Sequence, residues 1–294
     1  MVSALFEIGY HFQDSFAFLV LAAVGLAVIF GMMGVINLAH GEFIMLGAYI
    51  TVFTARAGVP LLLAILIAAS LVGVIGAIVE VLVVRRLYGR LLDTVAATWA
   101  IGLMLNQGML IIAGPSSPGV STPFGSFSIG GSSYSIYRVA LFLAALGVLV
   151  GLYFLFMKTR FGLDSRATIQ NPEVARSLGV DTQRIYTLTF ALGSALAGLT
   201  GGLYAPTAAI VPQFGASFIV ESFVTVIVGG ANVLIGMPIA GAILGAINSF
   251  LGQTWGTYIA RVGLLVATMF VIRVFPTGIS GLIDRIRLRP GAVK

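Results

Sequence analysis

The sequence predicts an all-α protein, a polytopic transmembrane helical bundle with broken or re-entrant segments. Of its 294 residues, 59% are hydrophobic and only 9% are charged, which leaves too little polar surface for a soluble domain. Long apolar runs recur along nearly the whole chain, and roughly 20 such residues cross the hydrocarbon of a bilayer. No polar stretch of domain size separates them. We therefore expect one transmembrane domain over residues 1–294, with the lipid membrane as its solvent.

Seven apolar runs are candidate spans. They cover residues 15–36, 41–55, 60–84, 94–113, 138–157, 185–208 and 256–274. The first run is too long for the apolar core of a signal peptide, so we expect it to be retained. A further stretch, 221–251, is considered separately below.

Basic residues predict the orientation of these spans. They form three clusters beside apolar runs, namely Arg85, Arg86 and Arg90, then Lys158, Arg160, Arg166, Arg176 and Arg184, and finally Arg285, Arg287, Arg289 and Lys294. The positive-inside rule places all three in the cytoplasm, which puts the N-terminus outside and the C-terminus inside. Topology therefore accounts for the net charge of +6, and we expect no nucleic-acid partner.

The stretch 221–251 must cross the membrane an even number of times to keep the C-terminus inside. It is short for two spans and is interrupted at Gly229-Gly230 and at Gly236-Met237-Pro238. Half-helices or a re-entrant pair fit best, and such breaks mark transport sites. An ordinary kinked packing helix is the alternative. Asn232 lies between the breaks, where it can meet a polar solute, whereas Glu221 can cap a helix N-terminus or contact the ligand.

The sharpest polar feature between apolar runs is Asn37-Leu38-Ala39-His40-Gly41-Glu42. Ionisable residues at membrane depth are costly and point to function. A metal site lacks further ligands at suitable spacing, and a hydrolase would need a nucleophile that the sequence does not provide. Two readings remain, which can hold together. Asn37, His40, Gly41 and Glu42 either form a hydrogen-bonded break between spans or help to gate a translocation path beside it.

The loop at 114–137, predicted to be extracytoplasmic, is rich in Gly, Ser and Pro. Its sequence SFSIGGSSYSIY alternates as a small β-hairpin does. The loop can serve as a docking rim or as an inert connector. Elsewhere, small residues recur at helical spacing in Gly193, Ala197 and Gly201, and again in Gly241 and Gly245, which predicts tight helix packing.

The cytoplasmic loop 158–184 contains signals for a short helix. Asn171 is an N-cap, Pro172 and Glu173 suit the first turn, and Gly179 is a natural stop. A loop that only connects two spans needs a few polar residues, so this helix is predicted to dock a partner.

The chain lacks the residues that would let it supply its own energy. Its only lysines, Lys158 and Lys294, do not follow the glycine spacing of a phosphate-binding loop, and it has no cysteine. Charges within the spans are too few for an obvious ion relay. Uphill transport would therefore need an external motor.

Three motifs, in order, resemble the permease subunits of bacterial ABC importers of the branched-chain amino acid and urea family. They are GVINLAHGEFIMLGAYI at 34–50, RATIQNPEVARSLGVDTQRIYTLTFALGSALAGLTGGLYAP at 166–206, and ESFVTVIVGGANVLIG at 221–236. The resemblance implies the ABC importer permease fold in a bacterial inner membrane. It also implies a second related permease, two cytoplasmic ATPases that bind the ATP, and an extracytoplasmic solute-binding protein.

The same resemblance implies roles for individual residues. The spacing of Glu173, Ala175 and Gly179, with Asn171 and Arg176, is similar to the loop by which such permeases contact their ATPases. This chain would then bind no cofactor and catalyse no reaction, and it would move its solute by alternating access.

The segment 213–230 is more similar to the urea and short-chain amide branch than to the amino-acid branch, so urea is the favoured solute at this point. A passive channel for a small polar solute and a membrane-embedded enzyme using His40 and Glu42 are the alternatives.

Overall fold

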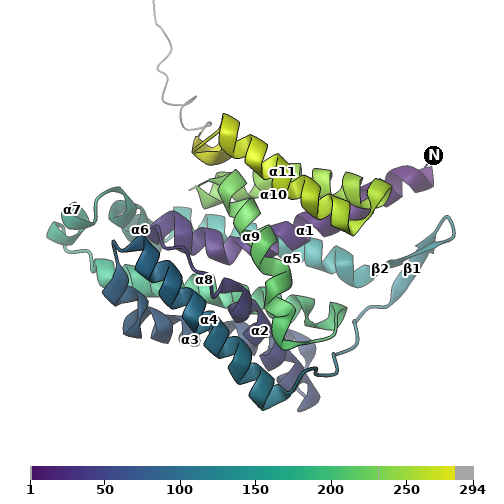
Figure 1. The fold of residues 1–294 in the computed structure, drawn as a ribbon, viewed down its shortest axis with the longest axis horizontal. Coiled ribbons are helices and arrows are strands. Elements are labelled where there is room, and N and C mark those ends of the chain that lie inside the picture. The colour runs from purple at the N-terminus through teal and green to yellow at the C-terminus, as the bar shows by residue number, and fades with distance from the viewer. Residues whose placement is uncertain (1, 231, 282–294) are drawn as a thin grey trace, which may run out of the picture.

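The protein, seen in a computed structural model that describes residues 2–230 and 232–281, is a bundle of helices with one small hairpin (Figure 1). The long helices are α1 (Val2–Met33), α2 (His40–Arg56), α3 (Leu61–Leu82), α4 (Leu91–Ala113), α5 (Ile136–Lys158), α8 (Thr182–Tyr204), α9 (Ala216–Gly229), α10 (Val233–Trp255) and α11 (Thr257–Val274). Among the described residues, eight helical segments are long and apolar enough to cross a membrane, and α2, which the sequence predicts as the span 41–55, is not one of them. The chain is therefore a multi-pass membrane protein of the predicted helical class.

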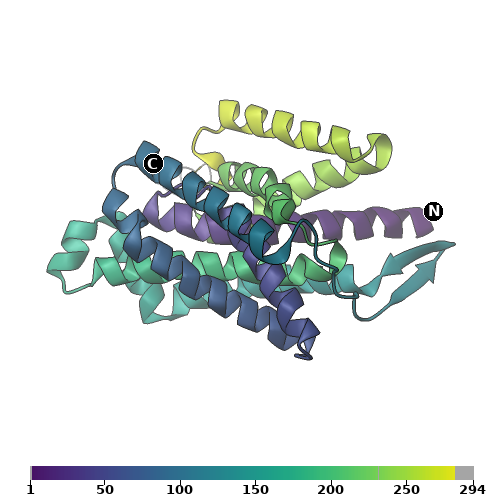
Figure 2. The same ribbon diagram turned by 60° about the horizontal axis from the view of Figure 1, so that its bottom comes forward.

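Helices α1, α2 and α8 form the centre of the bundle. Glycines on α8 bring the backbones together, because a Cβ at Gly201 would overlap the carbonyl oxygen of Ile44 in α2, and one at Gly193 would lie within 2.6 Å of the Gly25 oxygen in α1. This confirms the close packing predicted from the small-residue spacing. Helix α11 lies on the outside of α10 (Figures 1 and 2).

The predicted hairpin is present as β1 (Ser126–Ile129) and β2 (Ser132–Ser135), which pair antiparallel. Gly130 and Gly131 have φ values of 64° and 88°, the left-handed conformation that a two-residue hairpin turn requires. The hairpin stands at one end of the bundle and α7 (Pro172–Ser177) at the other (Figure 1).

The first two basic clusters lie near one another. Arg85, in the 3₁₀ helix η1 (Val84–Leu87), donates a hydrogen bond of 2.6 Å to Thr187 in the first turns of α8, directly after the second cluster. One face of the membrane can thus carry both clusters, as predicted, and the cytoplasmic assignment stays a prediction. The third cluster, 285–294, lies outside the described residues.

The segment 221–251 is interrupted once, not twice. Helix α9 ends at Gly229, Gly230 has a φ of +81°, and α10 starts at Val233, so the first break is where the sequence predicts it. The prediction of a second break is wrong, because α10 continues through Pro238. A proline this close to a helix start removes a single backbone hydrogen bond. With the 3₁₀ helix η3 (Pro212–Gly215) before α9, both arms are long enough to cross, so α10 is not a half-helix.

Candidate translocation site

The break between α1 and α2 is a tight, partly buried turn. Gly34 has a φ of +64°, and the side-chain oxygen of Asn37 accepts a hydrogen bond of 3.0 Å from the Ala39 backbone N–H. The Leu38 N–H donates to the Thr98 hydroxyl of α4 at 3.2 Å. The polar break predicted from the sequence is therefore real, and neighbouring elements satisfy much of its backbone.

His40 joins three helices at one carbonyl. Its Nε2 donates to the Ala22 oxygen of α1 at 2.9 Å, and the Ser222 hydroxyl of α9 donates to the same oxygen at 2.8 Å. Because a carbonyl can only accept, Nε2 must carry the proton, and Nδ1 has no hydrogen-bond partner among the described residues. Ala22, His40 and Ser222, here called the Ala22 node, are fully buried.

Glu42 and Gly41 face other neighbours. A Cβ at Gly102 of α4 would lie 3.2 Å from the Glu42 Oε2, so the carboxyl group lies against α4, whereas His40 bonds to α1. Gly41 is in backbone contact with Gly215 of η3, since a Cβ at Gly41 would lie 2.7 Å from the Gly215 oxygen. The four predicted residues share one junction, but His40 and Glu42 face different helices and do not form an acid–base pair.

Glu221 lies in the interior of α9, five residues past its first residue, so it does not cap the helix as the sequence suggested. Its Oε1 is 2.9 Å from Nε of Arg261 in α11. The two side chains line a cavity of about 220 Å³ between α9 and α11.

The residues at the break between α9 and α10 have structural contacts. Gly229 and Gly236 are in backbone contact, and a Cβ at Gly230 would lie 2.7 Å from the Thr277 oxygen. The Asn232 side chain accepts a hydrogen bond of 3.4 Å from the Ile235 N–H and so caps α10. Asn232 also lines a cavity of about 370 Å³ that Arg166 shares. We call it the inner cavity, because Arg166 belongs to the basic cluster that is predicted to be cytoplasmic. Asn232 is thus at a different cavity from Glu221, and the predicted pathway residues do not converge on one pocket.

A cavity of about 430 Å³ is lined by residues of α1, α5, α8, α9, α10 and α11, on the side of the bundle that is predicted to be extracytoplasmic. We call it the outer cavity. Its charged residues are Asp14, Arg138 and Arg261, none of which the sequence analysis selected. Two of them could have been noticed in the sequence. Arg261 is a charged residue inside a predicted span, and Arg138 lies outside the three basic clusters, next to the loop predicted to be extracytoplasmic.

The loop 158–184 forms two short helices, α6 (Arg160–Gln170) and α7. The predicted capped helix is α7, in which the Asn171 side chain accepts hydrogen bonds from the Glu173 and Val174 N–H groups at 3.0 and 3.1 Å. The helix ends before Gly179, whose φ is +89°. Ala175 is buried, whereas Glu173 and Arg176 are exposed. Helix α6 was not predicted.

The α7 region also presents apolar side chains to solvent. Val174 is 52% exposed and Leu178 is 78% exposed. Apolar groups flanked by opposite charges at the end of a bundle are typical of a protein-binding surface. We call Glu173, Val174, Arg176 and Leu178 the α7 surface.

Comparisons with known proteins identify the family. Residues 14–274 match the family model described as the permease component of branched-chain amino acid transport systems. The chain is 27% identical to the high-affinity branched-chain amino acid permease protein BraD of Pseudomonas aeruginosa, over 89% of this chain and 91% of the relative. It is 30% identical to the probable branched-chain amino acid permease LivH of Methanocaldococcus jannaschii, over 90% and 89% of the two chains.

A shorter similarity leads to another importer. The chain is 34% identical to the autoinducer 2 import permease LsrC of Escherichia coli, over 40% of this chain and 37% of the relative. No solved structure matches the chain. The relatives are transport permeases and not enzymes, which removes the enzyme alternative. The chain belongs to the family of permease components of branched-chain amino acid transport systems.

Proposed function

We propose that this protein is the permease subunit of an ATP-driven importer of branched-chain amino acids. It works by alternating access with a second related permease, two cytoplasmic ATPases that bind ATP, and an extracytoplasmic solute-binding protein. The family match over residues 14–274 supports this proposal, as do the relatives that are named for branched-chain amino acids. Urea and short amides, which the resemblance of residues 213–230 favoured, are the competing solutes.

The α7 surface is the observation that carries the motor part of the proposal. Helix α7 is only six residues long, and such a helix is not stable alone. Two cap hydrogen bonds accepted by Asn171 and the burial of Ala175 hold it in place. Glu173 and the remaining donors of exposed Arg176 are therefore available to a partner. The ATPase pushes here, and Arg176 transmits the movement through its 3.2 Å hydrogen bond to Thr182 at the start of α8.

The pathway residues keep two roles in this proposal. The Ala22 node couples α1, α2 and α9, so that movement of α8 and α1 reaches the path at Glu221. The break from Gly229 to Asn232 lets α9 move relative to α10 beside the inner cavity.

The test is uptake of labelled leucine and urea by cells that express the complete transporter. We expect leucine uptake that needs ATP, and we expect Glu173→Arg with Arg176→Glu to lower it at least about tenfold, because two charge contacts at an interface become repulsive. Asp93→Arg is the matched control, since Asp93 is a partly exposed charge beside another basic cluster and pairs with exposed Arg90.

The proposal fails in two distinguishable ways. Full uptake in the α7 double variant removes the docking role of the α7 surface. Solute entry that continues after ATP depletion identifies a passive channel.

A further inference from the structure

We infer that the outer cavity is a binding site for a zwitterionic amino acid with an apolar side chain. This inference rests on the proposed function and assigns the site at which the permease first holds its solute. The volume of about 430 Å³ is within the range of small-molecule sites. Six residues define the site chemically, namely Asp14, Phe18, Arg138, Tyr204, Phe218 and Arg261.

The cavity presents both charges that an amino acid requires. Asp14 pairs with Arg138, and Glu221 pairs with Arg261, so each guanidinium has one internal carboxylate. The arginine side chains are 49% and 53% exposed, whereas Glu221 is only 7% exposed. A guanidinium has five N–H donors, so the exposed parts of both arginines remain available to a ligand carboxylate.

Asp14 is the acceptor for the ligand ammonium group. Its side chain is 23% exposed, and it is the only carboxylate among the residues that line the outer cavity as described. Glu221 is buried behind Arg261 and does not line this cavity. One accessible carboxylate and two accessible guanidinium groups in the same cavity fit a zwitterion better than a cation or a neutral amide such as urea.

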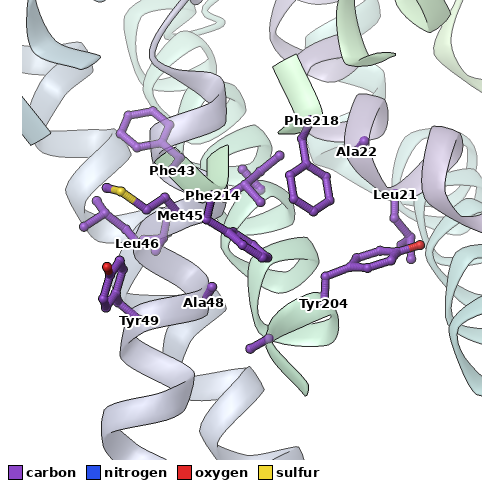
Figure 3. Close-up of a cluster of buried hydrophobic side chains, with 14 of the residues drawn as sticks. Leu21, Ala22, Phe43, Met45, Leu46, Ala48, Tyr49, Tyr204, Phe214 and Phe218 are labelled. Carbon is purple, nitrogen blue, oxygen red and sulfur yellow. The ribbon is translucent and has the colours of Figure 1, made fainter. Parts of the chain in front are cut away.

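Aromatic rings form the apolar part of the site. The ring centroid of Phe218 lies 5.1 Å from that of Phe18 and 5.5 Å from that of Tyr204, and Figure 3 shows Phe214, Phe218 and Tyr204 gathered together. Aromatic faces accept aliphatic side chains and attract ammonium groups. This aromatic group lies one helical turn from the Ala22 node, since Phe18 precedes Ala22 by four residues and Phe218 precedes Ser222 by four.

An unpaired hydroxyl belongs to one of the residues that line the site. Tyr204 is only 8% exposed and lines the outer cavity, yet its hydroxyl has no hydrogen-bond partner among the described residues. Buried hydroxyls are normally paired, because an unsatisfied one costs about 1–3 kcal/mol. The hydroxyl oxygen itself is covered by neighbouring side chains, so a ligand group reaches it only when these side chains move.

The absence of cysteine from the chain makes a direct test possible. Ser217→Cys places the only thiol of this subunit on an exposed position lining the outer cavity. In cells with the complete transporter, otherwise without cysteines accessible from outside, a membrane-impermeant thiol reagent should label it. Leucine at about ten times its Kd leaves roughly one site in eleven empty and should slow labelling about tenfold.

The ligand series tests the charges without further mutation. Leucinamide lacks the carboxylate, 4-methylpentanoate lacks the ammonium group, and urea lacks both, so none of them should protect Ser217→Cys as leucine does. Ser133→Cys, on exposed β2 of the hairpin, is the matched control and should be labelled at the same rate with every ligand. In the Ser217→Cys background, Asp14→Asn should abolish protection by leucine.

The outcomes separate this site from the proposed function. If the transporter accumulates leucine but leucine does not protect Ser217→Cys, the site assignment is wrong and the function stands. If leucine and 4-methylpentanoate protect equally, the charged part of the site is wrong. If the transporter accumulates urea and not leucine, the proposed function is wrong and the site assignment falls with it.

Discussion

The Ala22 carbonyl shows how one polar atom can organise several membrane helices. His40 from α2 and Ser222 from α9 both donate to it, at 2.9 and 2.8 Å, and all three residues are fully buried. Hydrogen bonds between membrane helices contribute modestly when measured singly, about 0.6 kcal/mol on average. Two donors on one acceptor also restrict the relative rotation of three helices, so the two bonds orient the helices as well as stabilise them.

Substitutions at this node should separate packing from gating. Ser222→Ala removes one of two donors and should cost about 1 kcal/mol. His40→Ala also leaves a cavity and should cost roughly 2–5 kcal/mol, whereas His40→Gln keeps an N–H donor. Thermal unfolding in detergent measures these losses. We expect His40→Gln to reach the membrane normally but to transport more slowly per molecule, and a normal rate would reduce His40 to a packing residue.

At the scale of elements, the two caps of the 158–184 loop provide a matched comparison. Asn171 caps the six-residue α7 with two hydrogen bonds, and Asp181 caps the 23-residue α8 with one, from the Arg184 N–H at 3.0 Å. Replacing either with alanine should cost about 1 kcal/mol. Only Asn171→Ala should lower ATP-dependent uptake, because α8 is held by packing along its length and α7 is not. Equal losses of uptake would contradict the coupling role of α7.

Glycines provide a second comparison between elements. Gly201→Leu must separate α8 from α2, because even a Cβ would overlap the Ile44 oxygen. Overpacking costs typically 1–3 kcal/mol or more, and we expect most of the protein to misfold. Gly151→Leu on α5 is the control, since no atom lies within 4 Å of a Cβ there. The amount of detergent-stable protein in size-exclusion chromatography measures both, and similar losses would contradict the packing role of Gly201.

The elements that the sequence predicted correctly have strong local signals. Apart from 41–55, which α2 covers without being long and apolar enough to cross, the predicted spans follow from hydropathy. Helix α7 follows from its cap and stop residues, and the hairpin from Gly130-Gly131. The start of α1 was missed because Glu7, His11 and Asp14 end the apolar run, although a helix that extends past the hydrocarbon accommodates such residues in water. Helix α6 mixes polar, charged and apolar residues and has no long apolar run, so its N-cap, Thr159, was not a sufficient signal by itself.

At the scale of the whole molecule, local signals do not locate cavities. The outer cavity combines residues from position 14 to position 261, and only the tertiary arrangement brings them together. The predicted pathway residues have the opposite property. Asn37 to Glu42 are adjacent in sequence and easily noticed, but His40 faces α1 and Glu42 faces α4. The adjacency of these residues in the sequence therefore located the junction between α1 and α2 correctly, but it did not indicate which cavities lie beside that junction.

The two cavities permit a test of alternating access in the assembled transporter. The outer cavity measures about 430 Å³ and the inner cavity about 370 Å³. The aromatic group lines the outer cavity, and the Ala22 node lies one helical turn further along α1 and α9. Ser217→Cys reports on the outer cavity, and Thr277→Cys, exposed on the inner cavity, reports on the other.

If ATP drives alternation, trapping the ATPases with ATP and vanadate should change the two labelling rates in opposite directions. Labelling is measured from outside in cells for Ser217→Cys and in inside-out vesicles for Thr277→Cys, with Ser133→Cys as the control that does not respond. A continuous channel exposes both thiols at once, so labelling rates that rise together, or that do not respond to nucleotide, would contradict alternating access. Opposite changes in the two labelling rates are expected if α1, α2 and α9 move together, and the hydrogen bonds at Ala22 connect these three helices.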